Sequence, residues 1–247
     1  EYISGNYKYL PGTHIMSASG CSHGRCIFCV ENGKPYEIRP VEDVISEIEE
    51  CKTLGFKEIF DDSATFPTGR WLDEFIIKLG NKISFSCNMR VGVDVDFKLL
   101  SNARFRMLLF GIESASQKTL TRISKGVKVE DIIPTLKKAS DSGLEPHIAF
   151  MFGYPWESDK DATRTLALVH YLLRKGYAKT AQASFYNPCT STEVSGSREN
   201  ARKYVKQIYG VWKYPDFWFN KIRGIKDIDD LKYFWRQIKE GLNQWNK

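Results

Sequence analysis

The chain has 247 residues, of which 42% are hydrophobic and 27% charged, and its formal net charge is +6. This length and composition suffice for one large folded core with an appendage. No apolar run approaches the roughly 18 residues of a membrane span, and the start shows no signal-peptide pattern, so we expect a soluble, cytoplasmic protein. Because acids and bases alternate along most of the chain, its mild basic excess does not require a nucleic-acid partner.

Strand-like and helix-like segments alternate along most of the sequence. We predict strands at 13–18, 57–63, 82–88, 106–112, 146–152 and 180–186. Helices are predicted at 41–54, 69–79, 96–102, 160–175 and 227–245, with a further helical stretch within 116–142. Such alternation gives a parallel sheet with right-handed crossovers, in a partial barrel or a doubly wound sheet. We predict an α/β fold, a partial (β/α)6 TIM-like barrel at 1–195, with a helical C-terminal extension at 196–247.

Three cysteines, Cys21, Cys26 and Cys29, lie within nine residues directly after the first predicted strand. Thiolates at this spacing suit zinc or an iron-sulfur cluster. Structural zinc normally takes four protein ligands, so the alternative of a zinc site needs His23 or a distant side chain to complete it. Three clustered cysteines cannot all pair with one another, which disfavours a disulfide framework. The sequence therefore favours a cluster with one open iron.

Polar residues follow each predicted strand, where an α/β barrel collects its functional side chains. In chain order they are Cys21, Cys26 and Cys29; Asp61, Asp62 and Ser63; Asn88 and Arg90; Glu113 and Ser114; Tyr154 and Glu157; and Tyr186 and Asn187. Because the strands themselves are mostly apolar, this pattern indicates one functional site at the carboxyl edge of the sheet.

The aromatic Phe28 directly before the third cysteine completes a pattern that resembles the radical S-adenosylmethionine (SAM) superfamily. The resemblance implies that the three cysteines hold a 4Fe-4S cluster, that SAM chelates the fourth iron, and that Phe28 lies near the adenine. The usual spacing has three residues between the first two cysteines, whereas Cys21 and Cys26 enclose four.

Further segments carry the same resemblance. Gly111 to Ser114 is similar to a Gly-Ile-Glu-Ser segment near the SAM methionine or ribose, Gly153 to Glu157 is similar to a Gly-x-Pro-x-Glu turn, and Asp61-Asp62 takes the place of a Gly-Gly-Glu segment. The cofactor-binding residues expected on this basis are Phe28, Asp61, Asp62, Ser63, Asn88, Arg90, Glu113, Ser114, Gly153 and Tyr186. Structural alternatives stay open: Glu113 as a helix cap or a partner of Arg90, Glu157 as a helix cap, and the two aspartates as strand ends.

Ser86 to Arg90 and the Leu-x-x-Ile-x-Lys-Gly run from Leu120 to Gly126 resemble radical SAM proteins with an upstream cobalamin-binding domain, and the resemblance as a whole covers about residues 15–193. It implies SAM cleavage to a 5'-deoxyadenosyl radical that abstracts hydrogen from a small-molecule, lipid or peptide substrate, with cobalamin-assisted methylation as one outcome. An electron donor such as flavodoxin or ferredoxin would be needed. The chain begins at Glu1 without methionine, which is consistent with a fragment of a longer protein. Cys189, after the last predicted strand, is a candidate catalytic thiol that donates or relays a hydrogen atom, with ordinary packing as its alternative.

Two other functions remain as alternatives: a radical SAM enzyme that modifies RNA, of methylthiotransferase type, and a non-catalytic, metal-stapled binding domain. The first rests on a basic, aromatic stretch from Arg198 to Lys226. This stretch is interpreted either as a cap over substrate or a surface for RNA, or as amphipathic helices that pack their rings inward.

Overall fold

The computed structural model describes residues 7–80, 83–187 and 198–245. Its main sheet has six strands, β1 (Gly12–Ile15), β4 (Glu58–Asp61), β5 (Ser84–Met89), β6 (Phe105–Glu113), β7 (Glu145–Phe152) and β8 (Thr180–Phe185). The strands lie side by side in chain order and every pair is parallel. A doubly wound sheet would reverse its strand order, so the prediction of a partial barrel is confirmed.

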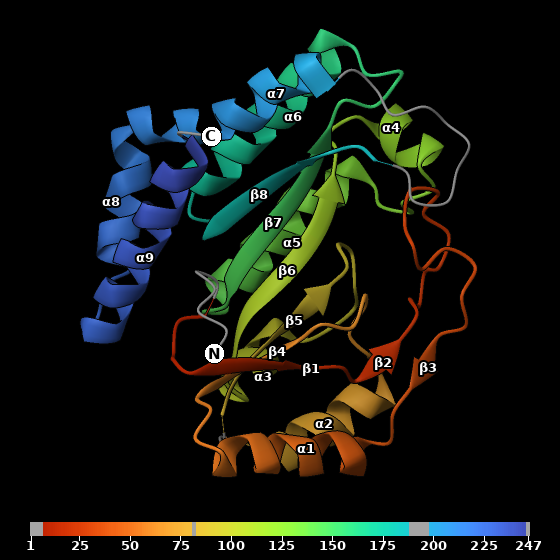
Figure 1. The fold of residues 1–247 in the computed structure, drawn as a ribbon, viewed down its shortest axis with the longest axis vertical. Helices are drawn as coiled ribbons and strands as arrows, with labels where there is room; N and C mark the ends of the chain where they lie inside the picture. The colour runs from red at the N-terminus through yellow and green to blue at the C-terminus, as the bar shows by residue number, and fades with distance from the viewer. Residues whose placement is uncertain (1–6, 81–82, 188–197, 246–247) are drawn as a thin grey trace.

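Helices connect the strands and cover the outer side of the curled sheet (Figure 1). They are α1 (Val41–Thr53), α2 (Arg70–Leu79), α3 (Phe97–Asn102), α4 (Gln117–Arg122), α5 (Val129–Asp141) and α6 (Asp159–Arg174). The helical stretch predicted within 116–142 is thus two helices. Ser124 and Gly126 between them both have positive φ, which a continuing helix cannot accommodate.

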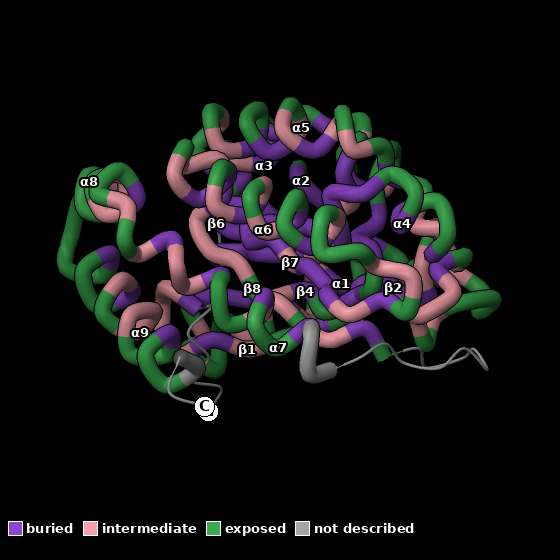
Figure 2. The backbone as a smooth tube through the Cα atoms, turned by 90° about the horizontal axis from the view of Figure 1, so that it is seen from above, coloured by how far each residue is buried: buried purple, intermediate pink, exposed green. Residues whose placement is uncertain are grey.

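The core lies between the sheet and its helices. Figure 2 shows the strands as the buried centre, with exposed residues on the outer turns of the helices. Phe66 is the hub of an aromatic cluster, with ring centroids 5.5 Å from Phe75, 5.6 Å from Phe85 and 5.8 Å from Phe105. Edge-to-face pairs of this kind add to the free energy gained from apolar burial, which makes the sheet a rigid support for its edges.

A second, two-stranded ladder joins the ends of the cysteine loop. Strand β2 (Ala18–Ser19) pairs antiparallel with β3 (Glu37–Ile38). Sequence reasoning missed this ladder because two residues are too few to show an alternating pattern.

The C-terminal segment forms α7 (Arg198–Gln207), the 3-10 helix η1 (Ile208–Lys213), α8 (Pro215–Arg223) and α9 (Ile228–Trp245). Helices α8 and α9 lie at the end of the sheet opposite β2, β3 and α4 (Figure 1). Arg236 of α9 donates to the carbonyls of Tyr7 and Lys8, 2.9 Å each. Helices α8 and α9 therefore do not cap the cysteine edge. In α8, which belongs to the basic, aromatic stretch, Phe217 is buried and Phe219 is exposed, so its rings pack inward only in part. The predicted boundary at 195 falls outside the described residues.

Within the described residues, no helix is long and apolar enough to cross a bilayer.

Candidate functional site

The cysteine loop leaves the carboxyl end of β1 and is pinned at its base. The buried carboxylate of Asp61, at the end of β4, accepts the Ser17 backbone N–H at 2.9 Å, the Ser17 hydroxyl, and the Ser63 N–H at 3.0 Å. The Ser63 hydroxyl in turn accepts the Ala18 N–H at 2.9 Å. Gly20 has φ +71°, and a Cβ there would lie 1.9 Å from the Pro35 carbonyl oxygen, so only glycine fits this close approach.

The three cysteines lie on this loop in different surroundings. Cys21 Sγ is 2.8 Å from the Thr65 hydroxyl, Cys26 Sγ is 3.8 Å from the Ser124 carbonyl, and Cys29 Sγ accepts the Glu31 N–H at 3.4 Å. No three His, Cys, Asp or Glu side chains among residues 7–80, 83–187 and 198–245 are already gathered as a metal-ligand group. The thiols are thus close in the chain and on one edge, with their side chains hydrogen-bonded to protein groups.

The ionisation of these thiols depends on their neighbours. Burial by itself raises the pKa of Cys21, but hydrogen bonds from Gly24 and Thr65 outweigh it, and the pKa is lowered. Burial raises the pKa of Cys26, against the charges of Lys125 and Arg90. Because only the thiolate is a metal ligand, the two nearby cations favour the form that a cluster requires.

His23, the candidate fourth ligand of a zinc site, is directed elsewhere. Its Nε2 lies 2.6 Å from the Ser124 carbonyl oxygen, which accepts the hydrogen bond. A Cβ on Gly126 would lie 2.5 Å from the His23 ring, so the ring packs directly on the α4–α5 loop. His23 therefore joins the cysteine loop to that loop, an arrangement that disfavours it as a zinc ligand.

Glu113 ends β6 in a strained conformation. Its φ is +69°, and the pairing of β6 with β7 shifts register between Gly111 and Glu113. Strain and bulges of this kind concentrate at functional sites. Of the two structural roles considered for Glu113, neither is present: its carboxylate accepts from Lys125 at 2.7 Å, not from Arg90.

Arg90, just after β5, donates to the carbonyls of Lys125 at 2.9 Å and Gly126 at 3.5 Å. The charges of Cys21 and Cys26 both act on its pKa, which burial lowers, so Arg90 lies between the cysteine loop and the α4–α5 loop. Asn88, two residues before Arg90 and still within β5, donates its side-chain N–H to the Ser63 carbonyl at 2.9 Å. The structure thus brings the polar ends of β4, β5 and β6 together with the cysteine loop, as predicted.

The remaining predicted residues divide between exposed and structural positions. Asp62 is exposed and lines a cavity of about 430 Å³ beside the cysteine loop, whereas Asp61 is buried as a strand-end anchor. The Ser114 hydroxyl is buried, 3.4 Å from Thr165 Oγ1, and accepts the Ser116 N–H at 3.1 Å.

Gly153, with φ +85°, donates its N–H to Glu157 at 2.7 Å. Glu157 does not cap α6, because Ser158 and Asp161 form the capping box there.

An aromatic wall stands over the same edge. Tyr186 lies 4.7 Å from Tyr154, 5.7 Å from Trp156 and 6.5 Å from Phe28, measured between ring centroids. The Lys125 ammonium is 6.0 Å from the Phe28 ring. The wall therefore connects the ends of β7 and β8 with the cysteine loop. Cys189, the candidate catalytic thiol, lies outside the described residues.

Comparison with known families identifies this arrangement. The sequence model of the radical SAM superfamily matches residues 15–169, more than half of the chain. The chain belongs to the radical SAM superfamily. The match begins in β1, includes all three cysteines and ends in α6, so it covers the edge just described except for Tyr186.

Two curated proteins are similar in sequence to this radical SAM chain. An uncharacterized methyltransferase of Pyrococcus horikoshii is 31% identical over 162 residues, 62% of this chain and 35% of the relative. A putative methylthiotransferase of Methanocaldococcus jannaschii is 28% identical over 203 residues, 73% of this chain and 43% of the relative. The chain thus spans less than half the length of either relative.

Solved structures share the fold at low sequence identity. The radical SAM methyltransferase TsrM from Kitasatospora setae, with cobalamin and a [4Fe-4S] cluster bound, has a TM-score of 0.61 at 17% identity, over 70% of this chain and 34% of that one. The cobalamin-dependent radical SAM enzyme OxsB has a TM-score of 0.56 at 16% identity, over 83% and 30%. These similarities establish the partial barrel of this radical SAM chain.

The residues present fit an iron-sulfur cluster by their chemistry. Three thiols lie on one loop, cations face two of them, and His23, the nearest nitrogen ligand, is engaged with Ser124. This donor set matches a cluster with three protein ligands. The sequence analysis assigns no role to Lys125, because its position 12 residues after Glu113 indicates a contact only once the fold brings the two side chains together.

Proposed function

We propose that this chain is the catalytic barrel of a radical SAM enzyme, with a 4Fe-4S cluster on Cys21, Cys26 and Cys29. The observation that carries the proposal is the position of this three-cysteine loop, at the carboxyl edge of a barrel whose sequence matches the superfamily. When bound, the cluster and SAM supply one-electron cleavage of SAM to a 5'-deoxyadenosyl radical, which removes a hydrogen atom from substrate.

The chain's own residues supply binding, orientation and exclusion of water. In the proposed site the three thiolates hold the cluster, and the cations of Arg90 and Lys125 balance their negative charge. Asp62 and Asn88 stand at strand ends where a ligand's ammonium or hydroxyl groups can be bound. The aromatic wall of Phe28, Tyr154, Trp156 and Tyr186 is expected to keep water and stray hydrogen donors from the reacting atoms.

The substrate reaction proposed first is cobalamin-assisted methylation. It is supported by the Pyrococcus horikoshii relative, which is named a methyltransferase, and by the fold shared with TsrM, solved with cobalamin bound, and with the cobalamin-dependent OxsB. Methylthiotransfer is the second candidate, favoured by the Methanocaldococcus jannaschii relative, which covers more of this chain. Cobalamin retained by the anaerobically purified protein would favour the first, and protein-bound sulfide in excess of iron after reconstitution would favour the second.

The central test is SAM cleavage. The protein is purified without air, reconstituted with iron and sulfide, reduced, and supplied with SAM, and 5'-deoxyadenosine is quantified. We expect product from the wild type and from Cys51→Ala, a cysteine on α1 away from the loop, and none from Cys21→Ala, Cys26→Ala or Cys29→Ala. Product that survives in any of the three variants, or zinc without labile sulfide in the purified protein, would refute the cluster assignment.

A further inference from the structure

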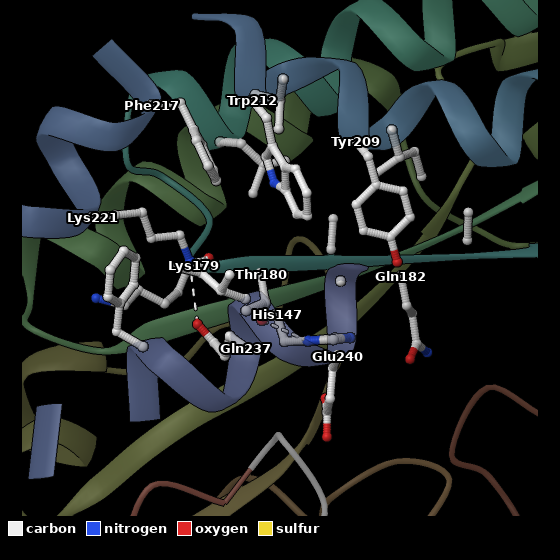
Figure 3. A pocket seen from close by; sticks show the side chains of 18 of the residues that line it. His147, Lys179, Thr180, Gln182, Tyr209, Trp212, Phe217, Lys221, Gln237 and Glu240 are labelled. Carbon is white, nitrogen blue, oxygen red and sulfur yellow. Dashed lines mark hydrogen bonds between the residues drawn. The ribbon is translucent and has the colours of Figure 1, made fainter. Parts of the chain in front are cut away.

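A cavity of about 460 Å³, whose lining side chains are drawn in Figure 3, lies where β7 and β8 begin. Its floor is formed by the first residues of β7 and β8, including His147 and Thr180, and its roof by η1, α8 and α9. The cysteine loop follows the opposite, carboxyl end of β1. The cavity has the size of a small-molecule site, about 300–1,000 Å³.

Aromatic rings form one wall of this cavity. Trp218 is the centre of the wall, with its ring centroid 5.9 Å from Trp212, 5.1 Å from Phe217 and 6.3 Å from Phe234. The Trp218 indole N–H donates to the Trp212 carbonyl at 2.7 Å, which fixes its orientation. A flat apolar ligand would stack on such a surface.

The polar groups of the cavity are few and incompletely paired. The Lys221 ammonium donates to the Lys179 carbonyl and to Gln237 Oε1 at 3.5 Å, and among the described residues no carboxylate forms an ion pair with it. Figure 3 shows its hydrogen bond to Gln237, with the Glu240 side chain directed away from it. The charge of Glu145 acts on Lys221 without forming an ion pair with it, so an anionic ligand would supply the direct counter-charge that this poorly solvated ammonium lacks.

Two further polar atoms lack partners. His147 is 3% exposed, with Nδ1 2.7 Å from the Thr180 hydroxyl and Nε2 unpartnered. The Gln237 Nε2 is buried and also unpartnered. Burial lowers the pKa of His147 to about 4, so its ring is neutral at pH 7, and burial together with Lys179 lowers that of Lys221 to about 7. An acceptor that reaches Lys221 and Gln237 would satisfy both groups.

We propose that this cavity binds a small aromatic carboxylic acid, whose ring stacks on the Trp212–Trp218 wall and whose carboxylate meets Lys221, Gln237 and His147. The lining contains three lysines, Lys179, Lys206 and Lys221, and no arginine, so it offers no bidentate fork for a phosphate. Lys221 beside Gln237 matches the single charge and the two acceptor oxygens of a carboxylate. The site lies far from the cysteine edge, so the proposal does not depend on the proposed radical chemistry.

The test compares three probes by isothermal titration: indole-3-acetate, its neutral analogue indole-3-acetamide, and acetate. We expect the wild type to bind indole-3-acetate at least about tenfold more tightly than the amide or acetate. In Lys221→Met the affinity for indole-3-acetate should fall to that for the amide, and retained binding of the amide would show that the cavity is intact. Lys239→Met, an exposed lysine on α9, removes the same charge and should leave the preference unchanged.

Two more variants keep the test decisive. Ala181→Met adds volume inside the cavity with Lys221 intact, and should weaken acid and amide alike. If Lys221→Met does not fold, Lys221→Gln removes the charge and keeps a donor for the Lys179 carbonyl. Equal affinity for acid and amide in the wild type, an undiminished preference in the Lys221 variant, or no binding of any probe at about 10 mM would overturn the proposal.

Discussion

The ammonium of Lys125 lies 2.7 Å from Glu113 Oε1, and this pair joins the strained end of β6 to the loop between α4 and α5. The same loop receives Arg90 and His23 through the backbone carbonyls of residues 124–126. A non-glycine residue with positive φ persists only where its surroundings stabilise it, and the ion pair with Lys125 stabilises Glu113 in this conformation. The pair is therefore a structural connection of the site as well as part of its charge.

We predict that Glu113 and Lys125 are energetically coupled. Their side chains are 10% and 13% exposed, so Glu113→Gln or Lys125→Met should each lower the free energy of unfolding by about 2 kcal/mol, because each leaves a poorly solvated partner. The double variant should lose less than the sum, with a coupling of at least about 1 kcal/mol in urea denaturation.

The control for this cycle is the Lys128–Glu130 pair, 3.8 Å apart and 72% and 77% exposed. Its coupling should be below about 0.5 kcal/mol, since water screens it. Equal coupling in the two cycles would contradict the role given to the Glu113–Lys125 pair.

Arg106 is predicted to hold the opposite end of the barrel together. Its guanidinium contacts Glu58 at 2.6 and 2.8 Å and Glu145 at 2.6 Å, and packs on the Tyr233 ring of α9. Arg106→Met leaves the buried carboxylate of Glu58 and the partly buried one of Glu145 without their cation, and should cost about 3–5 kcal/mol of unfolding free energy. Arg164→Met, on the exposed face of α6, should cost almost nothing; a similar loss in both variants would exclude the network as the cause.

Glu157 should make stability depend on pH. Burial raises its pKa from 4.5 to about 7, so the folded state binds this proton more tightly than the unfolded state. The stabilisation of the folded state by the protonated Glu157 carboxyl is fully present below pH 4.5 and is lost as the pH rises through about 7. Glu157→Gln keeps an acceptor for the Gly153 N–H but cannot ionise.

The unfolding free energy of Glu157→Gln relative to the wild type should therefore increase by about 2 kcal/mol between pH 5 and pH 8. Denaturant titrations of both proteins at the two pH values measure the change. A constant difference would show that Glu157 titrates as an ordinary carboxyl.

Asp61 and Asp62 should give different phenotypes although they are neighbours. Asp61→Ala leaves the Ser17 and Ser63 donors unpaired inside the protein and should lower unfolding free energy by about 2–3 kcal/mol. Asp62→Ala, at an exposed position, should leave stability unchanged and raise the SAM concentration needed for half-maximal cleavage. Unchanged cleavage in Asp62→Ala would remove Asp62 from the SAM site.

Local patterns in the sequence were enough to predict the alternation of strands and helices, the cysteine loop and the gathering of polar residues at one edge. These features are local: a period of two or 3.6 residues, three thiols in nine residues, and polar residues directly after apolar runs. Because consecutive parallel strands share one carboxyl edge, the placement of Asp62, Asn88, Arg90 and Glu113 beside the cysteines also followed from the order of the elements.

Which side chains contact one another could be read only from the folded structure. It paired Glu113 with Lys125 instead of Arg90, turned Asp61 inward and Asp62 outward, and directed His23 to the Ser124 carbonyl. It also placed the aromatic C-terminal helices at the opposite end of the sheet, where they enclose Lys221 and His147. Such pairings join residues tens of positions apart, and their geometry depends on the curl of the sheet and on helix packing, which no local pattern encodes.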